Sequence, residues 1–155
     1  LVQEASEEPL PDEELLLRWQ IMNLLLGNAD GHAKNLSLLH GLDGSVRLAP
    51  FYDMVSTLAY PGLSRDAALK IGEASDLGGA GPKHFDKLSM DCGLGARWVR
   101  SVVLDTAETL CGIIERSIDE LATAYRQEQA VRRLLRIVSR QAANVRNAFS
   151  QARSG

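Results

Sequence analysis

The sequence predicts a predominantly helical α+β domain that carries one small β-hairpin. Four stretches place apolar residues at the spacing of a packed helix, and two short apolar runs flank an Asp-Gly pair. The length of 155 residues, with 45% hydrophobic and 24% charged residues, suits one domain with a hydrophobic core. The sequence contains no internal repeat. We therefore expect a single helical domain over residues 12–155.

The first eleven residues differ in composition from the segment that follows them. Residues 1–11 are acidic, contain two prolines and lack apolar periodicity, so we predict a linker or junction there. Asp12 suits the N-cap of a helix over residues 12–26, with two glutamates in the first turn to match the helix dipole. This helix is apolar nearly all round, which predicts a position inside the domain. Gly27 is expected to end it.

The middle of the chain predicts short β structure between polar loops. Apolar runs at residues 36–40 and 45–49, joined by the Asp-Gly turn signal, predict the β-hairpin. A further strand is expected over residues 67–71. Residues 72–81 are rich in glycine and are predicted to form a loop.

The last part of the chain predicts a helical bundle over residues 82–152. Pro82 suits the first turn of a helix that ends before Gly93. A second helical pattern covers residues 96–125, and a third, rich in arginine, covers residues 127–152.

Composition and charge narrow the classes of function. The formal net charge of −3 and a pI near 5.6 argue against a dedicated nucleic-acid-binding protein. No apolar run approaches the ~18–20 residues that cross a bilayer, and no secretion signal is visible, so we expect a cytoplasmic location without membrane association. Cys92 and Cys111 form no CxxC pair, and we predict that they are reduced core residues.

Polar groups are most concentrated directly after the first long helix. Asp30, His32, Lys34 and Asn35 fall within six residues, between a buried helix and the hairpin. Catalytic groups are often mounted on such a loop, because rigid elements hold both of its ends. Downstream, Asp53 lies in an apolar stretch, where a carboxylate needs a hydrogen-bond donor or a cation.

The spacing of these residues fits the needs of phosphoryl transfer. Protein kinases place a catalytic aspartate and a magnesium-binding asparagine in the order Asp-x-x-x-x-Asn, and Asp30 and Asn35 have that separation. A second magnesium-binding aspartate follows a short hairpin, which is the position of Asp53. Taken singly, each residue could instead cap a turn or a helix.

Two segments carry a family resemblance. The sequences NADGHAKN over residues 28–35 and RLAPFYDMVST over residues 47–57 resemble the C-terminal domain of the HipA family, serine/threonine kinases of toxin–antitoxin modules. The resemblance extends from about residue 12 to about residue 125. It implies a protein-kinase-like C-terminal lobe with a catalytic loop at 28–35 and a metal-binding segment at 47–57.

The resemblance also implies roles for single residues and for partners. Asp30 would be the catalytic base, and Asn35 and Asp53 would bind Mg²⁺ and, through it, ATP. His32 and Lys34 would shape the loop or neutralise charge near the γ-phosphate. The implied partners are a protein substrate, a DNA-binding antitoxin and an N-terminal kinase lobe, with no direct contact to nucleic acid expected.

The main departure from the family is the missing N-terminal lobe. Its strand lysine and phosphate-covering loop find no counterpart, since the glycine-rich residues 72–81 follow the catalytic motif. We therefore expect this chain to belong to a longer protein and to be inactive alone. Two alternatives stay open: a non-catalytic module that binds an antitoxin, and a small-molecule kinase. The arginines of residues 127–152 are typical of a solvated face, with a surface facing an antitoxin or DNA as the alternative.

Overall fold

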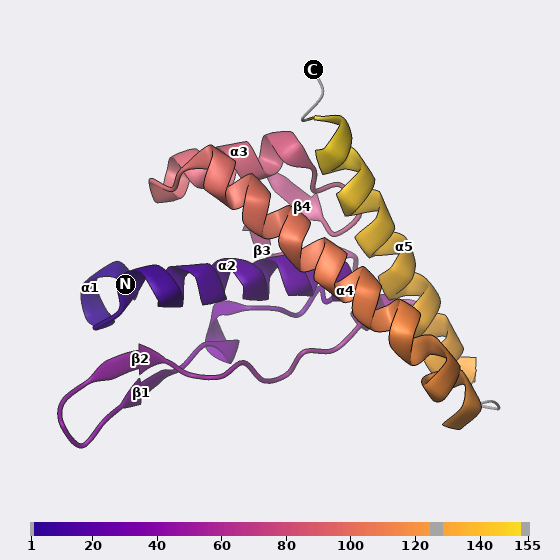
Figure 1. Cartoon of the computed structure of the whole chain (residues 1–155), viewed down its shortest axis with the longest axis horizontal. Helices are drawn as coiled ribbons and strands as arrows, with labels where there is room; N and C mark the ends of the chain where they lie inside the picture. Colours follow the sequence, from indigo (N-terminus) through magenta and orange to yellow (C-terminus); the bar gives the residue numbers. More distant parts are fainter. Residues whose placement is uncertain (1, 125–128, 153–155) are drawn as a thin grey trace.

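A computed structural model describes residues 2–124 and 129–152 of the chain. It is mostly helical, with two small antiparallel sheets, and it confirms the predicted α+β class (Figure 1). The helices are α1 (Val2–Ala5), α2 (Pro9–Leu26), α3 (Pro82–Cys92), α4 (Ala96–Ala124) and α5 (Gln129–Gln151). The strands are β1 (Leu38–His40), β2 (Val46–Leu48), β3 (Asp66–Ile71) and β4 (Ala74–Asp76), and the short 3₁₀ turns are η1 (Ala33–Asn35) and η2 (Thr57–Ala59).

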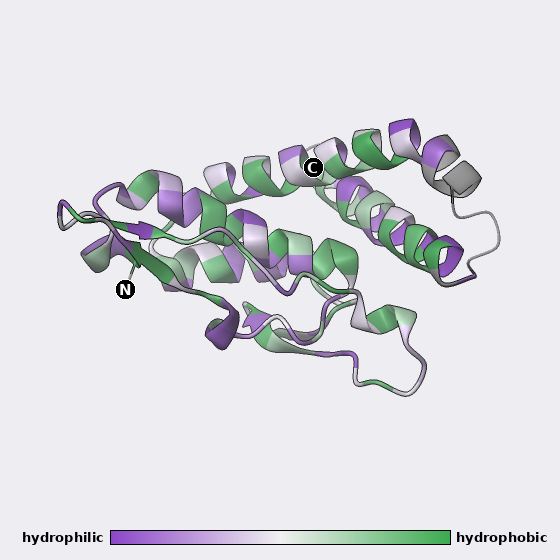
Figure 2. Ribbon diagram, turned by 90° about the horizontal axis from the view of Figure 1, so that it is seen from below, coloured by the Kyte–Doolittle hydropathy of each residue, from purple (hydrophilic) through white to green (hydrophobic). Residues whose placement is uncertain are grey.

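The core lies where α2 packs against α4 and α5, with α3 covering α4 at one end (Figure 1). Ile21 and Leu25 of α2 are completely buried, as are Val99 and Val103 of α4. In Figure 2 the long helices carry both hydrophobic and hydrophilic residues, and α4 and α5 each bury an apolar side in this core. Among the described residues, no helix is both long and apolar enough to cross a membrane.

Both sheets are two-stranded and antiparallel. In the first, Leu38 pairs with Leu48, which confirms the predicted hairpin. In the second, β3 confirms the predicted strand over residues 67–71 and pairs with β4. The prediction of a loop over 72–81 was wrong for Ala74–Asp76, because Gly72, at a φ of 57°, makes a tight turn that sends the chain back along β3.

The structure corrects the prediction for the first residues. Residues 1–11 were expected to be a loose junction, but they contain α1 and the start of α2. Proline is tolerated in the first helical turn, where its missing N–H has no partner to lose, so Pro9 can open α2. Asp12 is consequently inside the helix rather than at its N-cap, which is Glu8.

Asp12 instead anchors the hairpin. Its side chain is fully buried, and it accepts hydrogen bonds from the Ser6 hydroxyl at 2.6 Å and the Leu48 amide at 2.8 Å. The Arg47 guanidinium pairs with it at 3.0 Å and also reaches Glu8 at 2.9 Å. The hydrogen bond from Arg47, with the help of those from Ser6 and Leu48, lowers the pKa of Asp12 to about 2 against the desolvation that burial imposes.

Three smaller predictions have mixed outcomes. Cys92 is exposed at the end of α3, so the prediction that it lies in the core was wrong, whereas Cys111 is half-buried. Both thiols are free. The predicted end of one helix at Tyr125 and the predicted start of the next at Gln127 lie outside the described residues.

Candidate active site

The polar loop begins at a sharp stop of α2. Gly27 has a φ of 70°, and its amide donates back to the Leu24 carbonyl, which confirms the predicted helix end. The buried Asn28 follows, and its side-chain amide donates to the Asn23 Oδ1 at 2.9 Å. The Oδ1 of Asn28 accepts the Asp30 backbone N–H at 3.1 Å. Asn28 therefore links the helix to the loop that carries Asp30.

A threonine from the segment after the hairpin holds the same loop. The Thr57 Oγ1 accepts the Ala29 amide at 2.8 Å and donates to the Gly27 carbonyl at 3.1 Å. On the other side, the Ala29 carbonyl accepts the Ala68 amide of β3 at 2.8 Å. The loop is thus fixed by hydrogen bonds from two segments distant in sequence.

Close packing also restricts the residue after Asp30. A Cβ added to Gly31 would lie 2.7 Å from side-chain atoms of the buried Asn23. Any larger residue would displace that amide or the loop. The sequence motif had suggested chemistry at Asp30, but the steric need for glycine beside it was visible only in the structure.

The three residues predicted to act together converge. The Nδ2 of Asn35 lies 3.4 Å from the Asp53 Oδ2 and 3.4 Å from the backbone carbonyl of Asp30. Asn35 is buried, whereas the Asp30 and Asp53 side chains are exposed. The Asn35 side chain therefore links the backbone of Asp30 to the carboxylate of Asp53, which lies 23 positions further along the sequence.

Asp53 adopts an unusual backbone conformation. Its φ of 58° is positive, the sole case at a non-glycine residue within the described ranges. L-residues disfavour this left-handed region, and aspartate tolerates it better than most because its short side chain bonds locally. Strained residues cluster at functional sites, so this conformation is itself a signal of function that the sequence did not give.

His32 and Lys34 differ in how they relate to the cluster. The His32 Nε2 lies 3.9 Å from the Asp30 Oδ1, and its Nδ1 is buried with no hydrogen-bond partner in the described structure. The Lys34 side chain is exposed and has no contact within hydrogen-bonding distance among the described residues. The backbone carbonyl of Lys34 accepts the Tyr52 hydroxyl at 3.1 Å.

The two aromatic residues before Asp53 differ in burial. Phe51 is partly buried, with its ring centroid 5.9 Å from that of the buried Trp19. Tyr52 is half exposed, and its hydroxyl donates to the Lys34 carbonyl.

The donor set suits a hard divalent cation. The Asp53 carboxylate is exposed, and its contact among the described residues is the long one to Asn35, so its oxygens are accessible to a cation. A carboxylate oxygen and an amide oxygen are ligands that Mg²⁺ accepts. Asn35 now turns its amide nitrogen toward Asp53, as expected beside an anion, and would present its oxygen to a metal ion. These residues therefore fit a magnesium ion.

The chain is mostly helical, with an Asp-x-x-x-x-Asn loop and a second aspartate beyond a hairpin. Kinases have a lobe of this type. A model of the HipA-like C-terminal domain matches residues 1–114, and the chain belongs to this family. The chain is 32% identical over 125 residues to "Putative kinase Y4mE" of Sinorhizobium fredii. The aligned residues cover 81% of this chain and 30% of that protein.

Two further similarities concern a HipA kinase toxin. The chain is 35% identical over 68 residues to the serine/threonine-protein kinase toxin HipA of Shewanella oneidensis. The aligned residues cover 44% of this chain and 16% of that protein. The structure of the HipA, HipB and operator DNA complex from Shewanella oneidensis MR-1 matches with a TM-score of 0.84 and 19% identity. It covers 99% of this chain and 36% of that one. The chain thus spans less than two-fifths of the length of these relatives.

Proposed function

We propose that this chain is the catalytic C-terminal lobe of a HipA-like serine/threonine protein kinase, which transfers the γ-phosphoryl group of ATP to a protein hydroxyl. The observation that carries the proposal is the convergence of Asp30, Asn35 and Asp53 through the two 3.4 Å contacts of Asn35. Kinase catalysis needs mainly positioning and charge stabilisation, which these few polar groups can provide.

Each residue has a distinct part in the proposal. Asp30, exposed on a loop held at both ends, orients the acceptor hydroxyl and accepts its proton. Asn35 and Asp53 hold Mg²⁺, which when bound offsets the charge of the phosphate oxygens. His32 restrains the Asp30 carboxylate from 3.9 Å, and Lys34 supplies a mobile positive charge beside the phosphates.

The proposal includes partners beyond this chain. The relatives are about three times as long, so we propose that an N-terminal lobe supplies the remaining contacts to ATP. A HipA structure contains HipB, and we propose an antitoxin protein as a partner here too. Without the lobe, the same fold would serve as a non-catalytic binding module for that antitoxin.

Calorimetric titration of magnesium–ATP tests the proposal directly. It is done on this chain and on the full-length product of its gene, each with and without Asp53→Asn. We expect binding by the full-length protein, lost on substitution of Asp53, and little binding by this chain alone. Asp66→Asn, at an exposed aspartate of β3, is the matched control. Undiminished magnesium-dependent binding by full-length Asp53→Asn would remove Asp53 from the site.

A further inference from the structure

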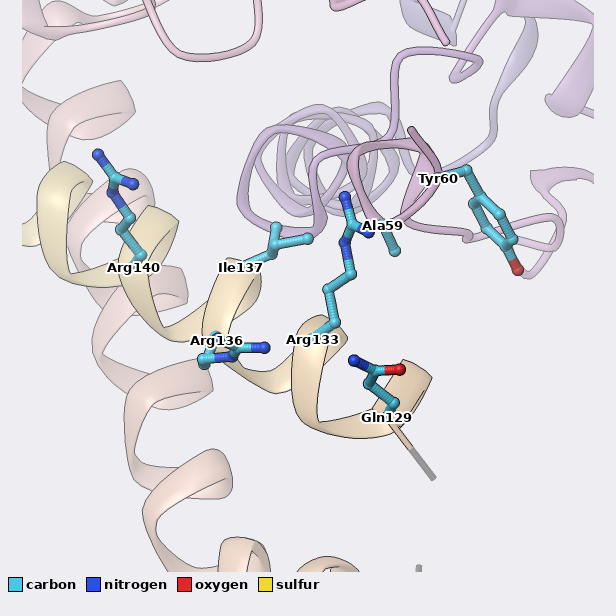
Figure 3. Close-up of a pocket in the computed structure, with 7 residues that line it drawn as sticks. All are labelled: Ala59, Tyr60, Gln129, Arg133, Arg136, Ile137 and Arg140. Carbon is cyan, nitrogen blue, oxygen red and sulfur yellow. The ribbon is translucent and has the colours of Figure 1, made fainter. Parts of the chain in front are cut away.

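One face of α5 carries a row of arginines outside the proposed active site. Arg133, Arg136 and Arg140 are three and four positions apart, so they share a side of the helix. Figure 3 shows their side chains around Ile137, with Arg133 extending toward the segment that contains Ala59. The row therefore lies opposite η2 rather than on an isolated helix surface.

The arginines line a groove. A cleft of about 820 Å³ lies between α5 and the end of η2, where the exposed Tyr60 forms its edge. A second hollow of about 420 Å³ shares Arg133 and Arg140 with the first and adds Arg65 from the segment before β3. Together the two hollows bring guanidinium groups from two elements to one groove.

Few of these charges are neutralised by the part of the chain that the structure describes. Over the described residues, Arg133 and Arg140 have no ion-pair or hydrogen-bond partner. Arg136 donates to a backbone carbonyl of its own helix at 3.3 Å, and the exposed Arg65 lies 3.9 Å from the nearest Asp76 oxygen. Like charges held side by side repel one another, so an anionic ligand would be bound favourably here.

The groove is connected to the proposed active site. Its wall, η2, begins at Thr57, whose hydroxyl is bonded to Gly27 and Ala29 of the catalytic loop. From Thr57 to Tyr60 is one 3₁₀ turn, a rise of roughly 6 Å. An extended peptide covers about 3.3 Å per residue, so the length of η2 corresponds to about two residues of a chain lying over it.

We propose that this groove binds acidic residues of the protein substrate that lie close in sequence to the acceptor hydroxyl. The inference rests on the proposed kinase function and adds a substrate class to it. Guanidinium groups suit this ligand because their paired N–H donors match the two oxygens of a carboxylate. The chain as a whole carries a net charge of −3, so its positive charge is confined locally, which favours a short acidic segment over a long polyanion.

The test uses a fluorescein-labelled peptide with one serine followed by six glutamates. Its binding to this chain is followed by fluorescence anisotropy at low and high salt. Arg133→Glu with Arg140→Glu should weaken binding by roughly tenfold or more at low salt, where charge interactions are least screened. Arg97→Glu with Arg116→Glu, at two exposed arginines of α4, changes the net charge equally and should leave binding nearly unchanged.

Several results would overturn the inference. The inference is wrong if the peptide fails to bind, or if the control pair of substitutions weakens its binding as much as the groove pair does. A labelled oligothymidylate that binds through Arg133 and Arg140 while the peptide does not would assign the groove to nucleic acid. If the glutamate variants lose their helical circular dichroism, Arg133→Gln with Arg140→Gln replaces them. In the full-length enzyme, the groove variants should raise KM for the acidic peptide and leave magnesium–ATP binding intact, which separates this inference from the proposed function.

Discussion

Asp12 contacts the strand β2 and Asp53 follows it in the sequence, yet the two aspartates are used in opposite ways. Asp12 is fully buried and surrounded by Ser6, Leu48 and Arg47 as donors. Asp53 is exposed, with one side-chain contact of 3.4 Å. A carboxylate whose oxygens all have protein donors stabilises a fold, and one left with open oxygens is available to a cation.

The two are also linked. Asp12 holds β2 against α2 through Leu48 and Arg47, and β2 is the strand that leads to Asp53. The hairpin separates Asn35 from Asp53 in sequence, and the two side chains meet at 3.4 Å across its base. Substitutions at the two aspartates should therefore separate stability from chemistry.

The largest effect is expected at Asp53. In the full-length enzyme, Asp53→Asn should reduce magnesium-dependent phosphoryl transfer by about a thousandfold, or ~4 kcal/mol, through loss of a charged metal ligand. Asparagine is chosen because it tolerates the positive φ. The melting temperature should stay within about 2 °C of the parent, since few contacts are lost. A phosphotransfer assay and a thermal melt on the same sample decide this, and a large fall in melting temperature would contradict it.

The second-largest effect is expected at Asp12, where substitution should lower the stability of the fold. Asp12→Ala removes one of the two carboxylate partners of Arg47, leaving Glu8, and leaves the Leu48 amide without its acceptor, so we expect a loss of about 3 kcal/mol in the free energy of unfolding. Urea denaturation of this chain measures it. Exposed Asp66→Ala should cost less than about 0.5 kcal/mol and serves as the comparison.

The pH dependence of the free energy of unfolding tests the role of Asp12 further. The folded pKa of Asp12 is lowered from 3.8 to about 2, so the unfolded chain takes up this proton first as the pH falls. The stability that the ionised group provides is complete above pH 3.8 and is lost as the pH drops toward 2. The stability gap between the parent and Asp12→Asn should narrow over this window. Unfolding curves at a series of pH values test it, and a gap that stays constant would refute the assignment.

A smaller effect is expected at Thr57, which joins the segment after the hairpin to the loop that carries Asp30. Thr57→Val keeps the shape of the side chain but removes the hydroxyl that bonds to Gly27 and Ala29. We expect a cost of about 1–2 kcal/mol and a decrease in kcat in the full-length enzyme, because the Asp30 loop is less well held. Thr57→Ser, which retains the hydroxyl, should restore most of both. Failure of serine to do so would point to the methyl group instead.

The smallest effect is expected at Tyr52. Tyr52→Phe deletes one exposed hydrogen bond to the Lys34 carbonyl, which water can replace. The free energy of unfolding should change by less than about 0.5 kcal/mol. A kcat lowered more than tenfold would show that this hydroxyl acts in the reaction.

Helices and hairpin were predictable because local periodicity and turn residues determine them. Asp30, Asn35 and Asp53 could be picked out because their spacing is a motif, although their roles remain proposals. The residues that hold the Asp30 loop in place were not predictable from the sequence. Asn28 and Thr57 lie within the two segments that carry the resemblance, but the partners of their hydrogen bonds are fixed by tertiary packing and could not be identified from the sequence. The acidic start was misjudged because a single turn of helix leaves no periodicity to detect.

The left-handed backbone at Asp53 has a consequence for descendants of this sequence. Glycine fits a φ of 58° without penalty, and asparagine fits it about as well as aspartate, so neither substitution would cost the fold much. Folding alone therefore does not require a charge at this position. Among relatives that share this lobe, the residue at this position would therefore distinguish working copies from those retained only as scaffolds.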